Sequence, residues 1–400
     1  MIDNIAFNFR RLCTDKYDID HVFQKDAYSW PGDWEGRALL AFCCHYEMHK
    51  TAVPCMHPLI AELKAHTNDG LYFGSPFDGK TVNEQQLSGH SWYLRGLLKY
   101  YRLFQDPVAL AAAKSTVEQL YLPALPFYAH YPLERPETDG GVSGHADLTL
   151  NGWILSSDVG CAFMCVDGLA DYYAETQDPR VKHYLDTVIS LFSEIDLLTY
   201  RFQTHTTLTC LRGILTLYER TGDESYLRIV EEKFEYYQQH GMTLTYENFN
   251  WFGRPDTWTE PCAVVDSLIL AVKLYRITGQ PRYRTLARRI WFNGLQFCQR
   301  QNGGVGPNTC VTPENPVLSV SMYEAPFCCT MRYAEGLLCY TQNKALFTVT
   351  ENEPESTDEL GRHFLGDRLL VKTGSEIRPI FSCRDFDEAQ ANAFKLEVIY

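Results

Sequence analysis

The strongest constraint on the fold is a recurring pattern of two helices joined by a tight turn. Apolar residues recur at helical spacing on both sides of a Gly, Asp or Pro turn. The pattern is seen in four stretches, beginning at Gly96, Gly168, Gly213 and Leu268, and a less regular pair precedes them, beginning at Gly36 and His57. A proline fits the first turn of the second helix in Asp106-Pro107, Asp178-Pro179 and Gln280-Pro281.

Irregularly spaced helical hairpins in this number predict a mainly α-helical chain that closes as an (α/α)6 barrel. A tetratricopeptide-type array is disfavoured because the repeats are unevenly spaced and the connections are long. After about Asn343 the segments ALFTVT, RLLVKTG and FKLEVIY read as β-strands. We therefore expect a catalytic (α/α)6 barrel over residues 1–343. Residues 344–400 should form a β-rich segment, either a small sheet or the start of a β-sandwich.

Charge and hydropathy exclude several classes of function. The formal net charge is −14, and an acidic surface repels phosphate backbones, which argues against nucleic-acid binding. The first 20 residues lack the apolar core of a signal peptide, and no apolar run approaches the roughly 20 residues of a membrane span. We expect a cytoplasmic protein whose 14 cysteines are mostly small buried core residues. The oligomeric state stays open, since a neighbouring subunit of a homo-oligomer could complete a pocket.

Two cysteine motifs carry the clearest chemical signal. Cys328-Cys329 is an adjacent pair, which is awkward for a mutual disulfide, yet both sulfurs can reach one soft metal ion. The Glu260-Pro261-Cys262 triplet adds a carboxylate oxygen and a third sulfur. Together these side chains make a Cys3Glu set, which suits tetrahedral Zn2+. The alternative is that Cys262 and one of the adjacent pair are core thiols and Glu260 is a solvated residue at a helix start.

From about Trp34 to Leu338 the order of these segments resembles glycoside hydrolase family 127, the β-L-arabinofuranosidase type. In that family a Glu-x-Cys element precedes a Cys-Cys pair, and the four side chains hold zinc. The resemblance therefore implies a Zn2+ site whose ligands are Glu260, Cys262, Cys328 and Cys329.

Other site residues are implied by the same resemblance. Glu247, in TLTYENFNWF, occupies the place of the family's acid/base glutamate. His90, in SGHSWYLRG, matches a Gly-His element that opens a barrel helix, and His205, in QTHTTLTCLRG, matches a later one loosely. Both histidines are expected to bind sugar hydroxyls. Independently of the resemblance, Trp251 lies close to Glu247 in the sequence and is expected to stack on a sugar face. The alternative for these three residues is a structural role in packing.

The implied activity is that of a retaining glycoside hydrolase acting on an oligosaccharide or glycoside, such as a β-L-arabinofuranoside. Cys328 would attack the anomeric carbon, and Glu247 would act first as acid and then as base. Zinc would remove the thiol proton and orient the sulfur. The resemblance, not the local sequence, selects Cys328 over Cys329 as the nucleophile.

The chain departs from the family at two places. Thr330-Met331-Arg332 stands where Pro-Pro-Asn and then Arg are usual, and the segment 293–327 differs from the family pattern. The identity of the sugar substrate therefore stays open. Two further functions stay open as well. One is a metal-free (α/α)-barrel glycosidase or sugar epimerase, insensitive to chelators and to loss of Cys328. The other is a non-catalytic carbohydrate-binding barrel with a structural zinc.

Overall fold

The predicted helical hairpins are present, and two of them, α5–α6 (84–116) and α8–α9 (165–193), share one type of turn. The first helix of a pair ends at a residue in the left-handed conformation, such as Gln105 (φ 54°) or Gln177 (φ 57°). The next residue is a helix cap: Asp106 accepts a hydrogen bond from the Val108 N–H at 2.8 Å. Proline then takes the first helical position, where no N–H is needed. The turn is therefore encoded in three consecutive residues.

The computed structural model describes residues 2–24, 30–135, 148–350 and 353–400. These residues form two compact units, one of residues 12–236 and one of residues 1–11 with 237–400. The 12–236 unit consists mainly of helices, whose bounds are α3 (Asp33–His49), α4 (Met56–His66), α5 (Glu84–Phe104), α6 (Pro107–Thr116), α7 (Leu122–Ala124), α8 (Cys165–Thr176), α9 (Pro179–Ser193), α10 (Thr204–Thr221) and most of α11 (Glu224–His240).

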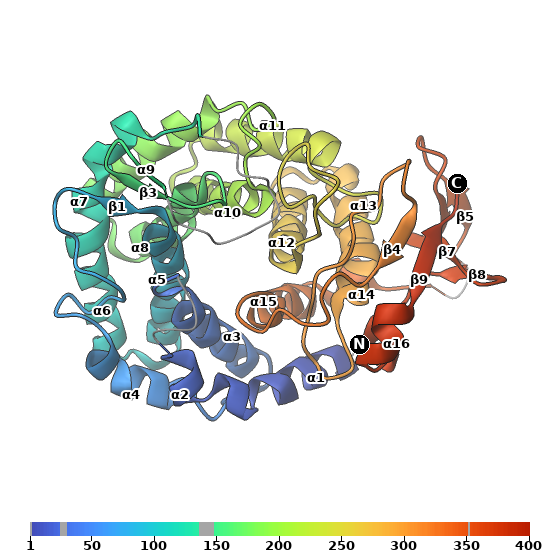
Figure 1. The fold of residues 1–400 in the computed structure, drawn as a ribbon, viewed down its shortest axis with the longest axis horizontal. Helices are drawn as coiled ribbons and strands as arrows, with labels where there is room; N and C mark the ends of the chain where they lie inside the picture. The colour runs from blue at the N-terminus through green and yellow to red at the C-terminus, as the bar shows by residue number, and fades with distance from the viewer. Residues whose placement is uncertain (1, 25–29, 136–147, 351–352) are drawn as a thin grey trace. The chain divides into compact units, whose positions relative to one another are not determined.

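Within this unit, α3, α5, α8 and α10 pack on one another in chain order, and α6, α7 and α9 lie outside that row (Figure 1). Glycines allow the close approach. A Cβ atom at Gly36 of α3 would lie 2.2 Å from the Tyr93 nitrogen of α5, and one at Gly168 of α8 would lie 2.7 Å from the Ser91 oxygen. The same unit also contains a short three-stranded sheet, in the order β1 (Val82–Asn83), β3 (Trp153–Leu155), β2 (Leu148–Leu150).

The 237–400 unit holds α12 (Pro261–Thr278), α13 (Pro281–Arg289), α14 (Gln296–Cys298) and α15 (Cys329–Gln342). The first helix of the chain, α1 (Ile2–Leu12), packs against α15. Asn4 donates to the Tyr333 hydroxyl at 3.1 Å, and Asn8 donates to the Thr330 carbonyl at 3.0 Å. One of the helices that pack on α15 therefore comes from the other end of the chain.

A six-stranded sheet lies in the same unit, with β4 before α15 in the chain and the other five strands after it. Its strand order is β4-β9-β7-β6-β5, with β8 paired to β7, and the pairs with defined register are antiparallel. The bounds are β4 (Val317–Ser319), β5 (Glu355–Thr357), β6 (His363–Leu365), β7 (Arg368–Thr373), β8 (Glu376–Pro379) and β9 (Lys395–Val398). The strands predicted in RLLVKTG and FKLEVIY are confirmed. The domain boundary at 343 stays a prediction.

The strand predicted in ALFTVT is wrong. Residues Lys344–Phe347 form a 3-10 helix instead. Phe347 is buried against the rings of Trp291 and Tyr340, at centroid distances of 5.8 and 5.2 Å. This packing on the preceding helices overrides the β-propensity of the segment.

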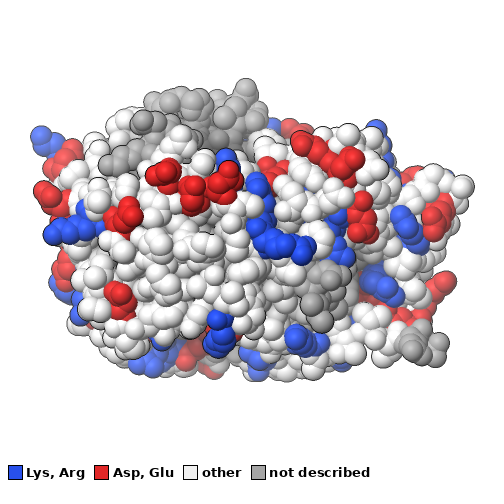
Figure 2. Space-filling model, turned by 90° about the horizontal axis from the view of Figure 1, so that it is seen from below, with Lys and Arg blue, Asp and Glu red and all other residues white. Residues whose placement is uncertain are grey.

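Acidic and basic side chains are both scattered across the face drawn in Figure 2, with uncharged surface between them. Among the described helices, none is both long and apolar enough to cross a membrane.

Candidate active site

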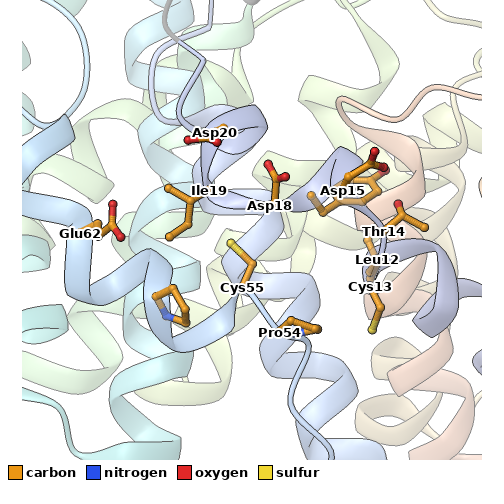
Figure 3. A pocket seen from close by; sticks show the side chains of 12 residues that line it. Leu12, Cys13, Thr14, Asp15, Asp18, Ile19, Asp20, Pro54, Cys55 and Glu62 are labelled. Carbon is orange, nitrogen blue, oxygen red and sulfur yellow. The ribbon is translucent and has the colours of Figure 1, made fainter.

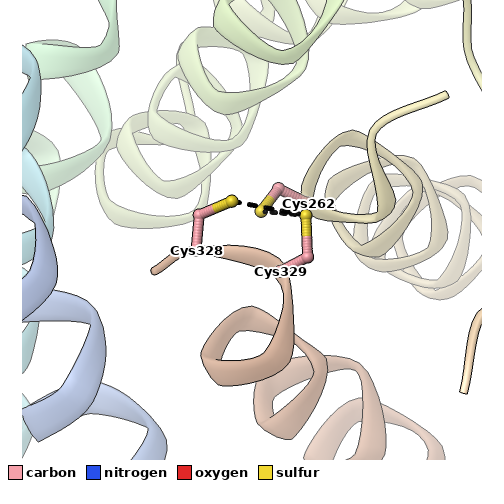
Figure 4. Close-up of side chains that lie close together, drawn as sticks. All are labelled: Cys262, Cys328 and Cys329. Atoms are coloured by element: carbon pink, nitrogen blue, oxygen red, sulfur yellow. Dashed lines mark hydrogen bonds between the residues drawn. The ribbon is translucent and has the colours of Figure 1, made fainter. Parts of the chain in front are cut away.

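Three cysteines meet where two packed helices begin. Cys262 is the second residue of α12, Cys329 is the first residue of α15, and Cys328 caps α15. The sulfur of Cys329 lies 3.4 Å from that of Cys328 and 3.5 Å from that of Cys262 (Figure 4). All three sulfurs lie within 4.8 Å of one another. The structure thus brings together three of the four predicted metal ligands.

The donor set fits a tetrahedral metal ion. An ion with Zn–S bonds of about 2.3 Å holds its sulfurs about 3.8 Å apart, which is close to the spacing of the three cysteines. All 14 cysteines lie in the described residues and none forms a disulfide. A carboxylate oxygen of Glu260, the fourth predicted ligand, lies within 4.8 Å of the Cys262 sulfur. Helix N-termini carry partial positive charge, which favours thiolates at these positions.

Local sequence fixes the start of α12 firmly. Glu260 occupies the N-cap position in extended conformation, and Pro261 supplies the first helical residue. The Glu260 N–H donates to the Asn248 side-chain oxygen at 2.8 Å. The backbone of the metal-ligand triplet is therefore held by a residue of the preceding loop.

A buried ion pair joins the two helices one turn below the thiols. Asp266 lies one turn after Cys262, and Arg332 lies one turn after Cys328. Arg332 donates to Asp266 and also pairs with Glu335 of its own helix. Asp266 and Arg332 are 0% and 1% exposed. This pair fixes the relative position of the two helix ends that present the cysteines.

We expect Arg332→Met to lower the free energy of unfolding by about 3–5 kcal/mol, because Asp266 would keep a buried charge without this cation. Denaturant unfolding measures the change. The double variant Arg332→Met/Asp266→Leu should recover much of the lost stability. Equal destabilisation of the single and double variants would show that the ion pair does not carry the effect.

Burial differs among the three thiols. Cys262 and Cys329 are 0% and 2% exposed, whereas Cys328 is 9% exposed. Burial raises the pKa of the Cys329 thiol, and the nearby Cys262 and Glu260 add to the shift. Cys328 is therefore the thiol that a small reactant reaches most easily.

Glu247 is completely buried in the loop between α11 and α12. One carboxylate oxygen accepts hydrogen bonds from Asn308 Nδ2 at 2.8 Å and Thr259 Oγ1 at 2.9 Å, and the Cys298 thiol lies at 3.4 Å. The other oxygen accepts from Thr245 Oγ1 at 3.0 Å. Burial raises the pKa of Glu247 despite these donors. The carboxyl group is thus held rigidly and kept closer to its protonated form.

Two residues that hold Glu247 in place, Arg300 and Asn308, were not among the predicted site residues. Arg300 is buried, and its guanidinium donates to the Asn308 side-chain oxygen at 2.9 Å and to the carbonyls of Phe297 and Gly306. This fixes the Asn308 amide with its nitrogen toward Glu247. Both residues fall in the segment 293–327, where the family resemblance is weak. The sequence signal available was the Gly- and Pro-rich run GGVGPN, since such loops are often functional.

The residue before Glu247 has an unusual backbone conformation. Tyr246 lies in the left-handed region with φ 63°, which costs a non-glycine residue on the order of 1 kcal/mol. Its hydroxyl accepts hydrogen bonds from Arg289 at 3.0 Å and Arg362 at 2.9 Å. These bonds help to hold the conformation that aims Glu247 toward Asn308.

His90 is fully buried in α5, with both ring nitrogens engaged. Nδ1 donates to the Gln86 carbonyl at 2.7 Å, and Nε2 accepts from the Phe73 N–H at 2.9 Å. Burial lowers the pKa of His90 to about 4. A sugar hydroxyl would have to replace one of these bonds, so the substrate-binding role of His90 stays a prediction.

We expect stability to fall by about 2 kcal/mol from about pH 7 to about pH 5 through His90. The pKa of His90 is about 4 in the folded chain and about 6.5 in the unfolded chain. Between these values the unfolded state binds more protons, so it gains stability as the pH falls. Denaturant unfolding at both pH values should show a smaller drop for His90→Leu than for wild type. His183→Gln, at an exposed site, serves as the control, and equal drops in all three proteins would contradict the assignment.

The remaining two predicted sugar-binding residues are also buried. His205, in the first turn of α10, stacks on Trp92 of α5 at a centroid distance of 5.8 Å. Trp251 packs edge-on against Trp258 at 5.7 Å. These contacts show that both rings pack within the fold, and their roles in sugar binding stay predictions.

A cavity of about 550 Å³ in the 12–236 unit contains two more cysteines (Figure 3). Cys13 and Cys55 share it with four carboxylates, those of Asp15, Asp18, Asp20 and Glu62. Burial, followed by the charges of Asp18 and Glu62, raises the pKa of Cys55 to about 12. The Cys55 thiol is therefore protonated at neutral pH and is a poor nucleophile.

No family model and no curated protein matches this sequence. Solved structures do match. A β-arabinofuranosidase of glycoside hydrolase family 127 has a TM-score of 0.58 at 12% identity, over 93% of this chain and 63% of its own. For a family 127 β-L-arabinofuranosidase from Geobacillus stearothermophilus T6 the TM-score is 0.56 at 12% identity, over 94% and 68% of the two chains.

A cellobiose 2-epimerase from Bacillus thermoamylovorans B4167 matches with a TM-score of 0.51 at 14% identity, over 86% of this chain and 100% of its own. The chain has the six-hairpin fold. The predicted class, a mainly helical (α/α)6 fold with a small C-terminal sheet, is thereby confirmed. Structures with this six-hairpin fold include hydrolases and epimerases of carbohydrates, and this chain spans 63% of the length of the first family 127 enzyme.

Proposed function

We propose that this chain is a retaining glycoside hydrolase with Cys328 as nucleophile and Glu247 as acid/base. The observation that carries the proposal is the meeting of three thiols at the N-termini of α12 and α15, with Glu260 beside one of them. The fold supports a carbohydrate substrate. The structural similarity to family 127 arabinofuranosidases, one of them a β-L-arabinofuranosidase, makes a β-L-arabinofuranoside the first substrate to test.

Glu260, Cys262, Cys328 and Cys329 would hold a zinc ion. When bound, zinc would supply positive charge that keeps the thiols ionised. In the first step the Cys328 sulfur forms a bond to the anomeric carbon while the glycosidic C–O bond breaks. The leaving oxygen takes a proton from Glu247. A pKa raised by burial favours this donor role.

In the second step the Glu247 carboxylate takes a proton from water, and the water oxygen bonds to the anomeric carbon while the C–S bond breaks. Two displacements restore the original anomeric configuration. The Arg300–Asn308 link keeps Glu247 in one orientation through both steps. We place the enzyme in the cytoplasm, where a reducing environment keeps its 14 free cysteines unoxidised.

The test is an assay of the purified chain with aryl β-L-arabinofuranosides, other aryl furanosides and aryl pyranosides. We expect furanoside hydrolysis, with the first-formed sugar in the anomeric configuration of the substrate by NMR. Inversion would contradict the mechanism. Hydrolysis of pyranosides alone would contradict the substrate class.

A second candidate function is sugar epimerisation, favoured by the match over the full length of a cellobiose 2-epimerase. That function predicts conversion of cellobiose without glycosidic cleavage, and no need for Cys328. Sugar binding without turnover of either kind would instead indicate a binding protein whose zinc is structural.

A further inference from the structure

A second cavity of the 12–236 unit is lined by aromatic and polar side chains. Its volume is about 380 Å³, within the roughly 300–1,000 Å³ range of small-molecule pockets. It lies where α3 begins and α4 ends, beside the segment 67–75. Three aromatic and three polar residues define its character: Trp30, Trp34, Phe73, Gln24, Glu35 and Ser75.

Several contacts hold one wall of this cavity in place. The Phe73 N–H donates to His90 Nε2, and the Phe73 ring packs edge-on against Tyr93 at 5.1 Å. The Asn68 side chain closes the adjoining turn, accepting from the Gly70 N–H at 2.9 Å and donating to the Gly74 carbonyl at 3.1 Å. A ligand would therefore meet a preformed aromatic surface, which lowers the entropy cost of binding.

The charge of the lining favours a neutral ligand. Among the described residues that line the cavity, none is Lys or Arg. Burial, followed by the charge of Asp33, raises the pKa of Glu35 to about 8, so its carboxyl group is largely protonated at neutral pH. His66, which also lines the cavity, stacks on Phe23 at 4.1 Å and lies 3.7 Å from Glu62. A protonated carboxyl group can both donate to and accept from a hydroxyl.

We propose that this cavity binds a neutral saccharide unit, with the sugar ring against the aromatic wall and its hydroxyls on Glu35 and Gln24. Sugars combine apolar ring faces with hydroxyls that both donate and accept, which matches this combination of aromatic and neutral polar groups. The proposal goes beyond hydrolysis at Cys328 and does not depend on it.

The test uses the full chain carrying Cys328→Ser, so that hydrolysis cannot consume the probe. An array of neutral oligosaccharides, including arabinofuranosides and cello-oligosaccharides, is compared with acidic ones, and affinities of hits are measured by calorimetry. We expect a neutral hit whose affinity falls about tenfold or more in Trp30→Ala and in Glu35→Leu. Glu35→Gln, a neutral isostere of the protonated acid, should keep the affinity within about twofold.

Thermal melting checks that each variant is folded. Trp30 lies outside the buried core, so its replacement by alanine should leave the fold intact. Absence of any hit, hits restricted to acidic glycans, or affinity unchanged in both Trp30→Ala and Glu35→Leu would overturn the proposal. Binding is read at equilibrium in an inactive variant. A wild-type chain that hydrolyses nothing would therefore count against the proposed function and leave this test intact.

Discussion

Purified wild-type protein is expected to contain about one zinc ion per chain, and Cys262→Ser to lose most of it. Cys262 is the fully buried member of the cluster, and its sulfur lies 3.5 Å from that of Cys329. A buried metal bound only by the folded chain stabilises it by about 4 kcal/mol at a free concentration of 1,000 Kd. Chelation and Cys262→Ser should therefore both lower the melting temperature.

Elemental analysis of protein purified without chelators measures the metal content. Cys339→Ser is the matched control, because Cys339 lies on α15 but outside the cluster. It should keep the metal and the melting temperature of wild type. A metal-free wild type, or equal metal loss in the Cys262 and Cys339 variants, would remove the basis for the zinc site.

Cys328→Ser is expected to lower turnover of the best furanoside by at least about 1,000-fold, because a hydroxyl replaces the attacking sulfur. Cys339→Ser should retain turnover close to wild type. Loss of Cys328 should act mainly on kcat, since the proposed role of this side chain is in bond formation. Steady-state kinetics of the two variants measures the difference.

Glu247→Gln tests directly whether Cys328 forms the bond to the sugar. With an activated aryl leaving group, the first displacement needs little acid assistance, whereas the second still needs a base. A glycosyl adduct should therefore accumulate on Cys328, visible by intact mass and by peptide mapping. An adduct on another residue, or full turnover in Cys328→Ser, would contradict the assignment of the nucleophile.

The helical hairpins could be predicted from sequence because their signals are local. Three consecutive residues, Gln105-Asp106-Pro107, determine the turn, and the apolar periodicity on either side predicts the two helices. The cysteines could be identified as candidate ligands from their residue type and the family resemblance. The strand predicted in ALFTVT is wrong because the burial of Phe347 depends on Trp291, which is distant in sequence.

The surroundings of the site could not be predicted for the same reason. Arg300 reaches Asn308 within one loop, but Asn308 reaches Glu247 across 61 residues. Arg332 meets Asp266 across 66 residues. A single sequence contains no record of such long-range pairs. The hydrogen bond from the Phe73 N–H to His90 could not be predicted either, because a backbone N–H donor is not marked by residue type.

The packing of α1 on α15 joins the first helix of the chain to a helix that is synthesised much later. The hydrogen bond between Asn4 and Tyr333 spans 329 residues. Asn4 therefore leaves the ribosome long before the helix that begins at Cys329 exists. Closing so long a loop costs chain entropy, and α15 gains this partner only after both segments are available. A tag or deletion within the first turns of α1 therefore acts on the helix that presents Cys328 and Cys329.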